Sequence, residues 1–165
     1  MSKAEFVLER FKESREWNSV TEVAALLEDF IKNNQEKIDE LNMPGNSSHG
    51  IEKIFEPILV GLEFSHEPSS EYPDRPLCPD FVNQKLGIIV EVERGKILQN
   101  NMDMLDFWKT HIHKECRYLI LLVPKVLAHS EKSREKPFER VKKRLGPFFE
   151  KTNETNVRGL VLLGY

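Results

Sequence analysis

The sequence contains PDFV at residues 79–82 and, after a short gap, IIVEVERGK at residues 88–96. The second stretch reads as an apolar β-strand with two carboxylates at its end. Because side chains alternate along a strand, Glu91 and Glu93 are expected on one face together with Ile89. Two carboxylates on one face of an apolar strand are costly to desolvate unless a cation or a protonated partner compensates them. This stretch therefore predicts a charged site built into the sheet.

A third carboxylate is expected close to this pair. Asp80 follows Pro79 on the preceding strand and is placed to bring a further oxygen donor to the same point. Hard oxygen ligands are those that magnesium prefers, so the three residues predict a Mg²⁺ or Mn²⁺ site for phosphodiester hydrolysis. The alternative interpretation is a turn aspartate with Glu91 and Glu93 on the solvated outer face of an edge strand.

The remaining elements are predicted from hydrophobic periodicity and turn residues. The N-terminal part, residues 1–45, is expected to be a helical extension, with one helix over 4–17 and a second that opens at the capping box of residues 19–22 and runs to about Leu41. The elements that follow are a helix over 49–62, strands near 62–65, 79–82 and 86–94, a helix over 102–113, a strand over 118–123, a basic helix over 137–145 and a strand over 159–163.

This order of elements predicts a single α/β domain over residues 1–165, with a mixed central sheet and helices on both faces. Residues 118–123 are apolar at every position, which is typical of a central strand covered on both sides. In the helix over 102–113, Leu105, Trp108 and Ile112 are expected on the buried face. Residues 125–165 are expected to add the last helix and strand.

Composition restricts the class of protein. The chain has 165 residues, of which 39% are hydrophobic and 31% charged, values typical of one soluble globular domain. No apolar run is long enough to span a bilayer, and the first residues lack the apolar core of a secretory leader. The two cysteines form neither a metal-binding nor a disulfide pattern. A cytoplasmic protein without membrane contact is therefore expected.

The charge is distributed unevenly along the chain. The net charge is −3, a mild argument against a nucleic-acid partner. Residues 1–40 carry six basic and ten acidic side chains, a net charge of −4, whereas residues 125–151 carry nine basic and four acidic ones, a net charge of +5. A basic segment can contact phosphates, so Lys142, Lys143 and Arg144 are candidate nucleic-acid contacts. The alternative is a solvated helix face.

The order helix, three strands, helix, strand over residues 49–124 resembles the core of the PD-(D/E)xK nuclease superfamily, which is restriction endonuclease-like. Pro79-Asp80 matches the family's PD, and Glu91-Val92-Glu93 matches its (D/E)xK tripeptide with glutamate in place of lysine. This ExE variant is similar to that of BamHI-type restriction endonucleases. The resemblance implies an αβββαβ core, preceded here by additional residues.

The resemblance also implies roles for individual residues. Asp80, Glu91 and the carbonyl of Val92 are expected to hold Mg²⁺ or Mn²⁺, and Glu93 is expected to orient or deprotonate the attacking water. Glu52 would hold an outer-shell water; its alternative is an acid favoured by the helix dipole.

Further residues follow from the position of the family's lysine, which moves in sequence while keeping its place in space. Lys96, and more remotely Lys85, would supply the missing ammonium. Lys109, on the helix after the ExE strand, would contact the substrate backbone.

The implied activity is Mg²⁺-dependent hydrolysis of DNA that leaves a 5′-phosphate, by a homodimer if both strands of a duplex are cut. Two alternatives remain open. One is a catalytically inactive binding or assembly module of the same fold, which the acidic net charge and the absent lysine favour. The other is an RNA-directed nuclease.

Overall fold

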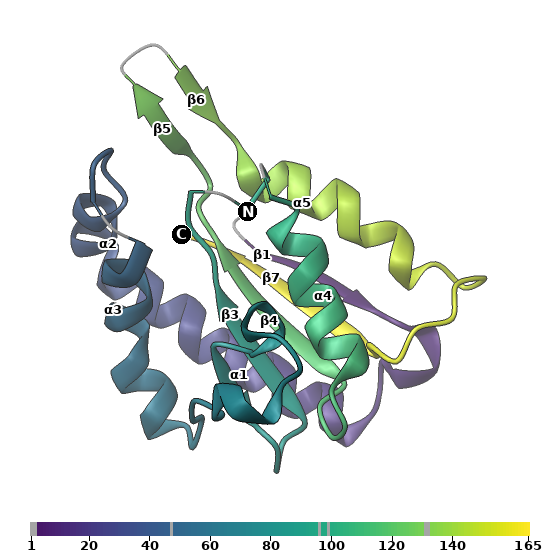
Figure 1. Cartoon of the computed structure of the whole chain (residues 1–165). Coiled ribbons are helices and arrows are strands. Elements are labelled where there is room, and N and C mark those ends of the chain that lie inside the picture. The colour runs from purple at the N-terminus through teal and green to yellow at the C-terminus, as the bar shows by residue number, and fades with distance from the viewer. Residues whose placement is uncertain (1–2, 47, 96, 99, 131–132) are drawn as a thin grey trace.

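The computed structural model describes residues 3–46, 48–95, 97–98, 100–130 and 133–165, and its central feature is a five-stranded mixed sheet with helices on both faces (Figure 1). The strands of this sheet, in the order β1-β7-β4-β3-β2, are β1 (Lys3–Val7), β7 (Gly159–Gly164), β4 (Tyr118–Val123), β3 (Ile88–Val92) and β2 (Phe81–Asn83). The helices are α1 (Arg15–Asn33), α2 (Gln35–Leu41), α3 (Ser48–Gly61), α4 (Met102–Ile112) and α5 (Pro137–Leu145). A separate hairpin consists of β5 (Leu127–Ser130) and β6 (Ser133–Glu135).

The sheet is parallel at its centre and antiparallel at its edges. Strands β3, β4 and β7 run parallel to one another, while β1 pairs antiparallel with β7 and β2 with β3. Every residue of β4 is buried, as expected for a strand with apolar side chains on both faces. The prediction of a central strand over 118–123 in a mixed α/β fold is confirmed.

Each face of the sheet has its own hydrophobic core. On one face, Ile88 and Val90 of β3 pack in a core that includes α1 and α3; on the other, Ile89 packs in a core that includes α4 and α5. The alternation predicted for β3 is therefore confirmed. It places Glu91, which has the same parity as Ile89, on the α4 side of the sheet.

The prediction of a helix over residues 4–17 is wrong. Residues 3–7 form the edge strand β1 rather than the start of a helix, with Ala4 opposite Leu162 of β7. Ala4 packs in the core on the α4 side while its neighbour Glu5 is exposed, an alternation of period two that a short segment does not distinguish from a helix. Residues 1–45 are therefore not a purely helical extension.

Helix α1 begins earlier than the predicted capping box. Its N-cap is Ser14, whose hydroxyl oxygen accepts a hydrogen bond from the Trp17 backbone N–H at 3.0 Å. The helix breaks at Asn34, after which α2 continues to Leu41. Helix α3 runs through Pro57, close to the predicted range of 49–62.

The predicted three-strand meander is present only in part. Strands β2 and β3 form the expected hairpin, but the strand predicted near 62–65 is reduced to a single bridge between Ser65 and Val82. The β5–β6 hairpin, which leaves the sheet after β4, was not predicted from the sequence. Among the described residues, no helix is both long and apolar enough to cross a membrane.

Candidate metal centre

The two carboxylates of the ExE tripeptide lie at the carboxyl end of β3. Glu91 is completely buried and Glu93, directly after the strand, is partly buried. Strand β3 lies between β2 and β4, so it is not an edge strand. The alternative interpretation, a solvated outer face, is therefore wrong for Glu91.

A third carboxylate reaches the same point from α4. Oxygen atoms of Glu91, Glu93 and Asp106 all lie within 4.8 Å of one another. Asp106 is completely buried. Three carboxylates this close together are a donor set that suits a hard divalent cation.

Glu91, Glu93 and Asp106 are referred to below as the carboxylate cluster. A buried ammonium lies against it. The Nζ atom of Lys109, also on α4, is 2.8 Å from Oε2 of Glu91 and 2.9 Å from Oδ1 of Asp106. Burial alone would lower the pKa of Lys109, but the charges of Glu91 and Asp106 outweigh it and raise that pKa. Lys109 is only 5% exposed. It therefore lies on the inner side of α4, and its contact with a substrate backbone stays a prediction.

Asp80 lies beside the carboxylate cluster, one residue before β2. Its Oδ2 accepts a hydrogen bond from the Val92 backbone N–H at 3.0 Å, and its own backbone N–H donates to Oε1 of Glu91 at 3.3 Å. The structure therefore places Asp80 next to Glu91, but the group of three carboxylates consists of Glu91, Glu93 and Asp106 and does not include Asp80. Val92 turns its backbone toward Asp80 while its side chain packs against the core on the α1–α3 side.

The proximity of these acids raises their proton affinities. Burial, followed by repulsion from Asp106 and Asp80, raises the pKa of Glu91 well above its ordinary value. The same causes raise the pKa of Glu93 to about 9. Burial raises the pKa of Asp106 to about 6, although Lys109 acts against it. A bound dication would favour the ionised forms instead, so protons and a metal compete for these oxygens.

This competition predicts how stability depends on pH. Glu93 and Asp106 have folded-state pKa values of about 9 and about 6 against ordinary values of 4.5 and 3.8, so the folded state holds their protons longer than the unfolded state does. Their contribution to stability is complete below about pH 4 and is lost as the pH rises toward 9. We expect the free energy of unfolding, measured with urea in the presence of a chelator, to fall by a few kcal/mol over this range, because a tenfold change in proton affinity corresponds to about 1.4 kcal/mol.

The matched variant for this measurement is Glu93→Gln. Glutamine does not titrate in this range, so the decrease between about pH 5 and pH 9 should become smaller. Addition of Mn²⁺ to the wild-type protein should oppose the decrease. A free energy of unfolding that rises with pH over this range in the wild type would contradict the burial of these carboxyl groups.

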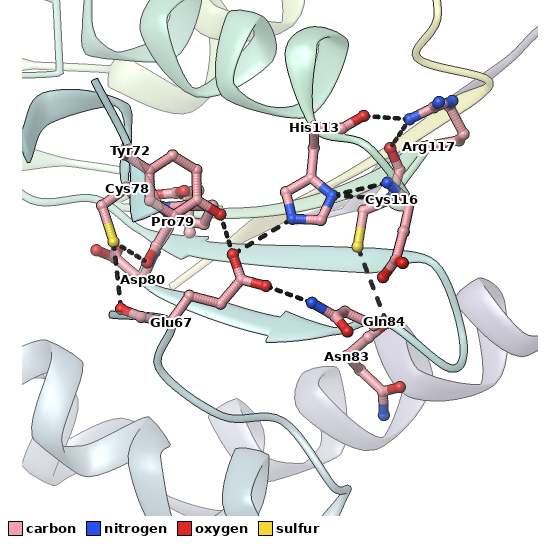
Figure 2. Close-up of polar contacts among 12 residues, drawn as sticks. Glu67, Tyr72, Cys78, Pro79, Asp80, Asn83, Gln84, His113, Cys116 and Arg117 are labelled. Atoms are coloured by element: carbon pink, nitrogen blue, oxygen red, sulfur yellow. Dashed lines mark hydrogen bonds and ion pairs between the residues drawn. The ribbon is translucent and has the colours of Figure 1, made fainter. Parts of the chain in front are cut away.

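The segment that carries Asp80 is held by a partly buried polar network (Figure 2). The Glu67 carboxylate accepts hydrogen bonds from the Tyr72 hydroxyl and, at 2.7 Å, from Nε2 of Gln84 on the β2–β3 turn. It also lies 3.3 Å from Nε2 of His113, which directly follows α4. This network joins the loop before β2 to the helix that supplies Asp106. The relative positions of the acids are therefore set by contacts between elements distant in sequence.

Helix α4 is rotated about its axis relative to the prediction, so that the face expected to be buried is exposed. Trp108 and Ile112 are 46% and 50% exposed, so the prediction that they are buried is wrong. The residues of α4 that are buried are Asp103, Asp106, Phe107, Lys109 and Thr110. Four of these are polar, and the charges of Glu91 on β3 explain the inward orientation of Lys109.

Asp106 was not predicted from the sequence. Its signal was the spacing of Asp103, Asp106 and Thr110 on one helical face, directly after a strand that ends in two carboxylates. On this face of the helix, Lys109 compensates the charge of Glu91, whereas Asp106 repels it.

Two other predicted residues, Glu52 and Lys85, are not in the carboxylate cluster. Glu52 lies on α3, which packs on the opposite face of the sheet from α4. Lys85 is at the turn of the β2–β3 hairpin, where its Nζ is 3.3 Å from Oε2 of Glu63, at the other end of β3 from Glu93. Lys96 lies outside the described residues.

The basic residues of α5 divide into two groups. Lys142 and Lys143 are exposed and remain candidate nucleic-acid contacts. Arg144 instead turns toward α4, with Nε 3.2 Å from Oδ2 of Asp103 and Nη2 donating to Oδ1 of Asn101 at 2.7 Å. Its guanidinium connects α5 to α4.

The chain was compared with known proteins on the basis of both sequence and structure. No protein-family model, no curated protein and no solved structure matches it.

Proposed function

We propose that the chain is a divalent-metal-dependent nuclease that hydrolyses DNA phosphodiester bonds. The observation that carries this proposal is the convergence of carboxylates from β3 and α4 within 4.8 Å, with the buried ammonium of Lys109 against them. Hard oxygen donors and an adjacent cation form the chemical setting in which a phosphate anion can be bound and attacked.

The residues present fit a magnesium or manganese ion. Glu91, Glu93 and Asp106 would hold it, with Asp80 beside them. When bound, such an ion neutralises charge on the scissile phosphate and lowers the pKa of the attacking water. The ExE tripeptide, which resembles that of restriction endonuclease-like enzymes, supports this proposal, although the first strand of the expected αβββαβ order is reduced to a bridge at Ser65.

Lys109 supplies the ammonium that the ExE tripeptide lacks. Its pKa is raised by Glu91 and Asp106, so it stays protonated at neutral pH and donates hydrogen bonds without accepting a proton. A fixed positive charge stabilises the negative charge that develops on phosphate oxygens in the transition state. In this proposal Lys109 has the role of the family's lysine, whereas Lys85 lies at the other end of β3.

The proton acceptor in this scheme is Glu93. In the metal-free protein, burial and the charges of Asp106 and Asp80 raise the pKa of Glu93 to about 9. A bound dication would lower that pKa, so that the carboxylate is ionised and able to accept the proton of the attacking water. Glu93 lies directly after the last residue of β3 and is more exposed than Glu91.

The proposal is tested with a panel of single- and double-stranded DNA and RNA, incubated with Mg²⁺, Mn²⁺ or a chelator. Cleavage of DNA is expected only with the divalent ions. Asp80→Asn should lower the rate by at least about 100-fold while the fold is retained, because asparagine can still accept the Val92 N–H. Glu91→Ala should abolish cleavage.

The control for this panel is Asp29→Asn, an exposed residue of α1 whose carboxylate pairs with Lys32. Full activity of Asp80→Asn, or cleavage by the wild type in chelator, would contradict the proposal. Cleavage confined to RNA substrates would support an RNA-directed nuclease. Cutting of both strands of a duplex should coincide with a dimer in sedimentation experiments.

One observation favours the second candidate, a catalytically inactive binding or assembly module. Lys109 already compensates Glu91 and Asp106 within the protein itself, so the carboxylate cluster is tolerated without a metal. Calorimetric titration with Mn²⁺ in the presence of DNA separates the two functions. Heat of binding that disappears in Asp80→Asn and Glu91→Ala supports the nuclease, whereas no binding to the wild type supports the module.

A further inference from the structure

The backbone pairing between β3 and β4 ends at Glu93, because the next residue that could donate to it, directly after β4, is a proline. The Glu93 N–H donates to the Leu122 carbonyl at 2.9 Å, which continues the parallel pairing of β3 with β4. In a parallel ladder, the carbonyl of the same residue then accepts from the residue two positions further along the partner strand. That residue is Pro124, which has no N–H.

A tyrosine hydroxyl occupies this vacant donor position. The Tyr165 hydroxyl donates to the Glu93 carbonyl oxygen at 2.6 Å. Tyr165 follows β7, which lies on the far side of β4 from β3, and its own N–H donates to the Val123 carbonyl at 3.0 Å. The position marked C accordingly lies near the carboxyl ends of the parallel strands (Figure 1).

The ring of Tyr165 and the carboxylate of Glu93 are on opposite faces of the sheet. Tyr165 is 3% exposed and packs in the α1–α3 core, with its ring centroid 6.2 Å from that of Phe55. The Glu93 carboxylate is on the α4 face with Asp106. The hydroxyl therefore acts on the Glu93 backbone without entering the carboxylate cluster.

We propose that Tyr165 is a positioning residue that replaces the missing Pro124 N–H and so fixes Glu93 at the end of β3. Its effect on metal binding rests on the proposed function, whereas its effect on the strand end does not. The next residue, Arg94, is anchored separately by bonds from its guanidinium to the carbonyls of Asn46 and Met43. Loss of the hydroxyl should therefore loosen Glu93 without unfolding the loop that follows.

The test compares Tyr165→Phe with a rescue variant. Phenylalanine keeps the packing on Phe55 and removes only the donor. We expect amide hydrogen exchange at Glu93 to become about tenfold faster and Mn²⁺ binding to weaken by about the same factor, the effect of one lost hydrogen bond. Adding Pro124→Ala to this variant restores an N–H at the ladder position and should return both measurements close to wild-type values.

Tyr118→Phe is the matched control. Tyr118 is also buried, but within the described part of the chain its hydroxyl has no hydrogen-bond partner. Its removal should leave exchange at Glu93 and Mn²⁺ binding unchanged. If Glu93 exchange is unaltered in Tyr165→Phe, or if Pro124→Ala does not rescue it, the positioning role is overturned.

The exchange measurement separates this inference from the proposed function. Absence of Mn²⁺ binding to the wild type would argue against the metal site, yet faster exchange at Glu93 in Tyr165→Phe, restored by Pro124→Ala, would still support the positioning role. Unaltered exchange alongside normal Mn²⁺ binding would reject the role and leave the metal site intact.

Discussion

Lys109→Met is expected to lower the rate of DNA cleavage by about 10²–10⁴-fold while Mn²⁺ binding is retained or becomes tighter. The ammonium is 2.8 Å from Glu91 and 2.9 Å from Asp106. Its removal makes the net charge of the site more negative, which favours the binding of a cation. The same removal takes away the fixed positive charge that would stabilise the phosphate in the transition state. Binding and catalysis should therefore change in opposite directions.

The variant should also show a distinctive loss of stability. Removing one partner of a buried ion pair costs about 3–5 kcal/mol when the other charge stays ionised. At about pH 8 in chelator we expect a loss of this order, and at about pH 5 a smaller loss, because Asp106, with a pKa of about 6, can then take up a proton. Saturating Mn²⁺ should restore most of the stability, which allows cleavage to be measured on folded protein.

Lys37→Met is the control, because Lys37 is exposed on α2, outside the carboxylate cluster and not among the candidate nucleic-acid contacts. Single-turnover cleavage, calorimetric Mn²⁺ titration and urea unfolding are measured on both variants. Wild-type cleavage rates in Lys109→Met would exclude the lysine from the reaction. A parallel loss of metal affinity and cleavage would indicate that Lys109 only maintains the shape of the site.

Asp106→Asn is expected to weaken Mn²⁺ binding by at least about 100-fold and to lower cleavage correspondingly, because it removes a charged oxygen ligand. Its effect on the metal-free protein should have the opposite sign. Four acids lie near a single lysine, and neutralising one of them relieves repulsion acting on Glu91 and Glu93. We expect the free energy of unfolding in chelator at about pH 8 to rise by about 1–2 kcal/mol.

Asp103→Asn provides a matched comparison on the same helix. Asp103 is equally buried, but its carboxylate pairs with Arg144 on α5 and does not belong to the group of three. This variant should lower stability and leave Mn²⁺ affinity unchanged. If Asp106→Asn destabilises the metal-free protein as Asp103→Asn does, the carboxylate cluster is a structural ion-pair network and not a site selected for binding.

The errors in the sequence-based predictions have a common physical origin. Residues 3–7 are too short to distinguish a strand from a helix, and their state is decided by the free edge of β7, more than 150 residues away. The first strand of the expected meander shrinks to one bridge at Ser65. Both outcomes depend on pairing partners, which local periodicity does not specify.

Helix α4 shows the same limit at the candidate site. Its apolar residues predict Trp108 on the inner face, and hydrophobic burial alone would favour that orientation. The ion pairs of Lys109 with Glu91 and Asp106 accompany an orientation in which Trp108 and Ile112 are exposed instead. The rotation of the helix is thus a property of the charges on the neighbouring strand as well as of its own sequence.

The sequence by itself determined the alternation along β3, the central position of β4 and the meeting of Asp80 with Glu91. These follow from the two-residue period of a strand and from a short hairpin, both of which act over a few residues. Only the tertiary structure decided that Asp106 and Lys109 complete the carboxylate cluster. A helix can present any of its faces to a sheet, and the face it presents is fixed by the sum of apolar burial and charge compensation across the whole interface.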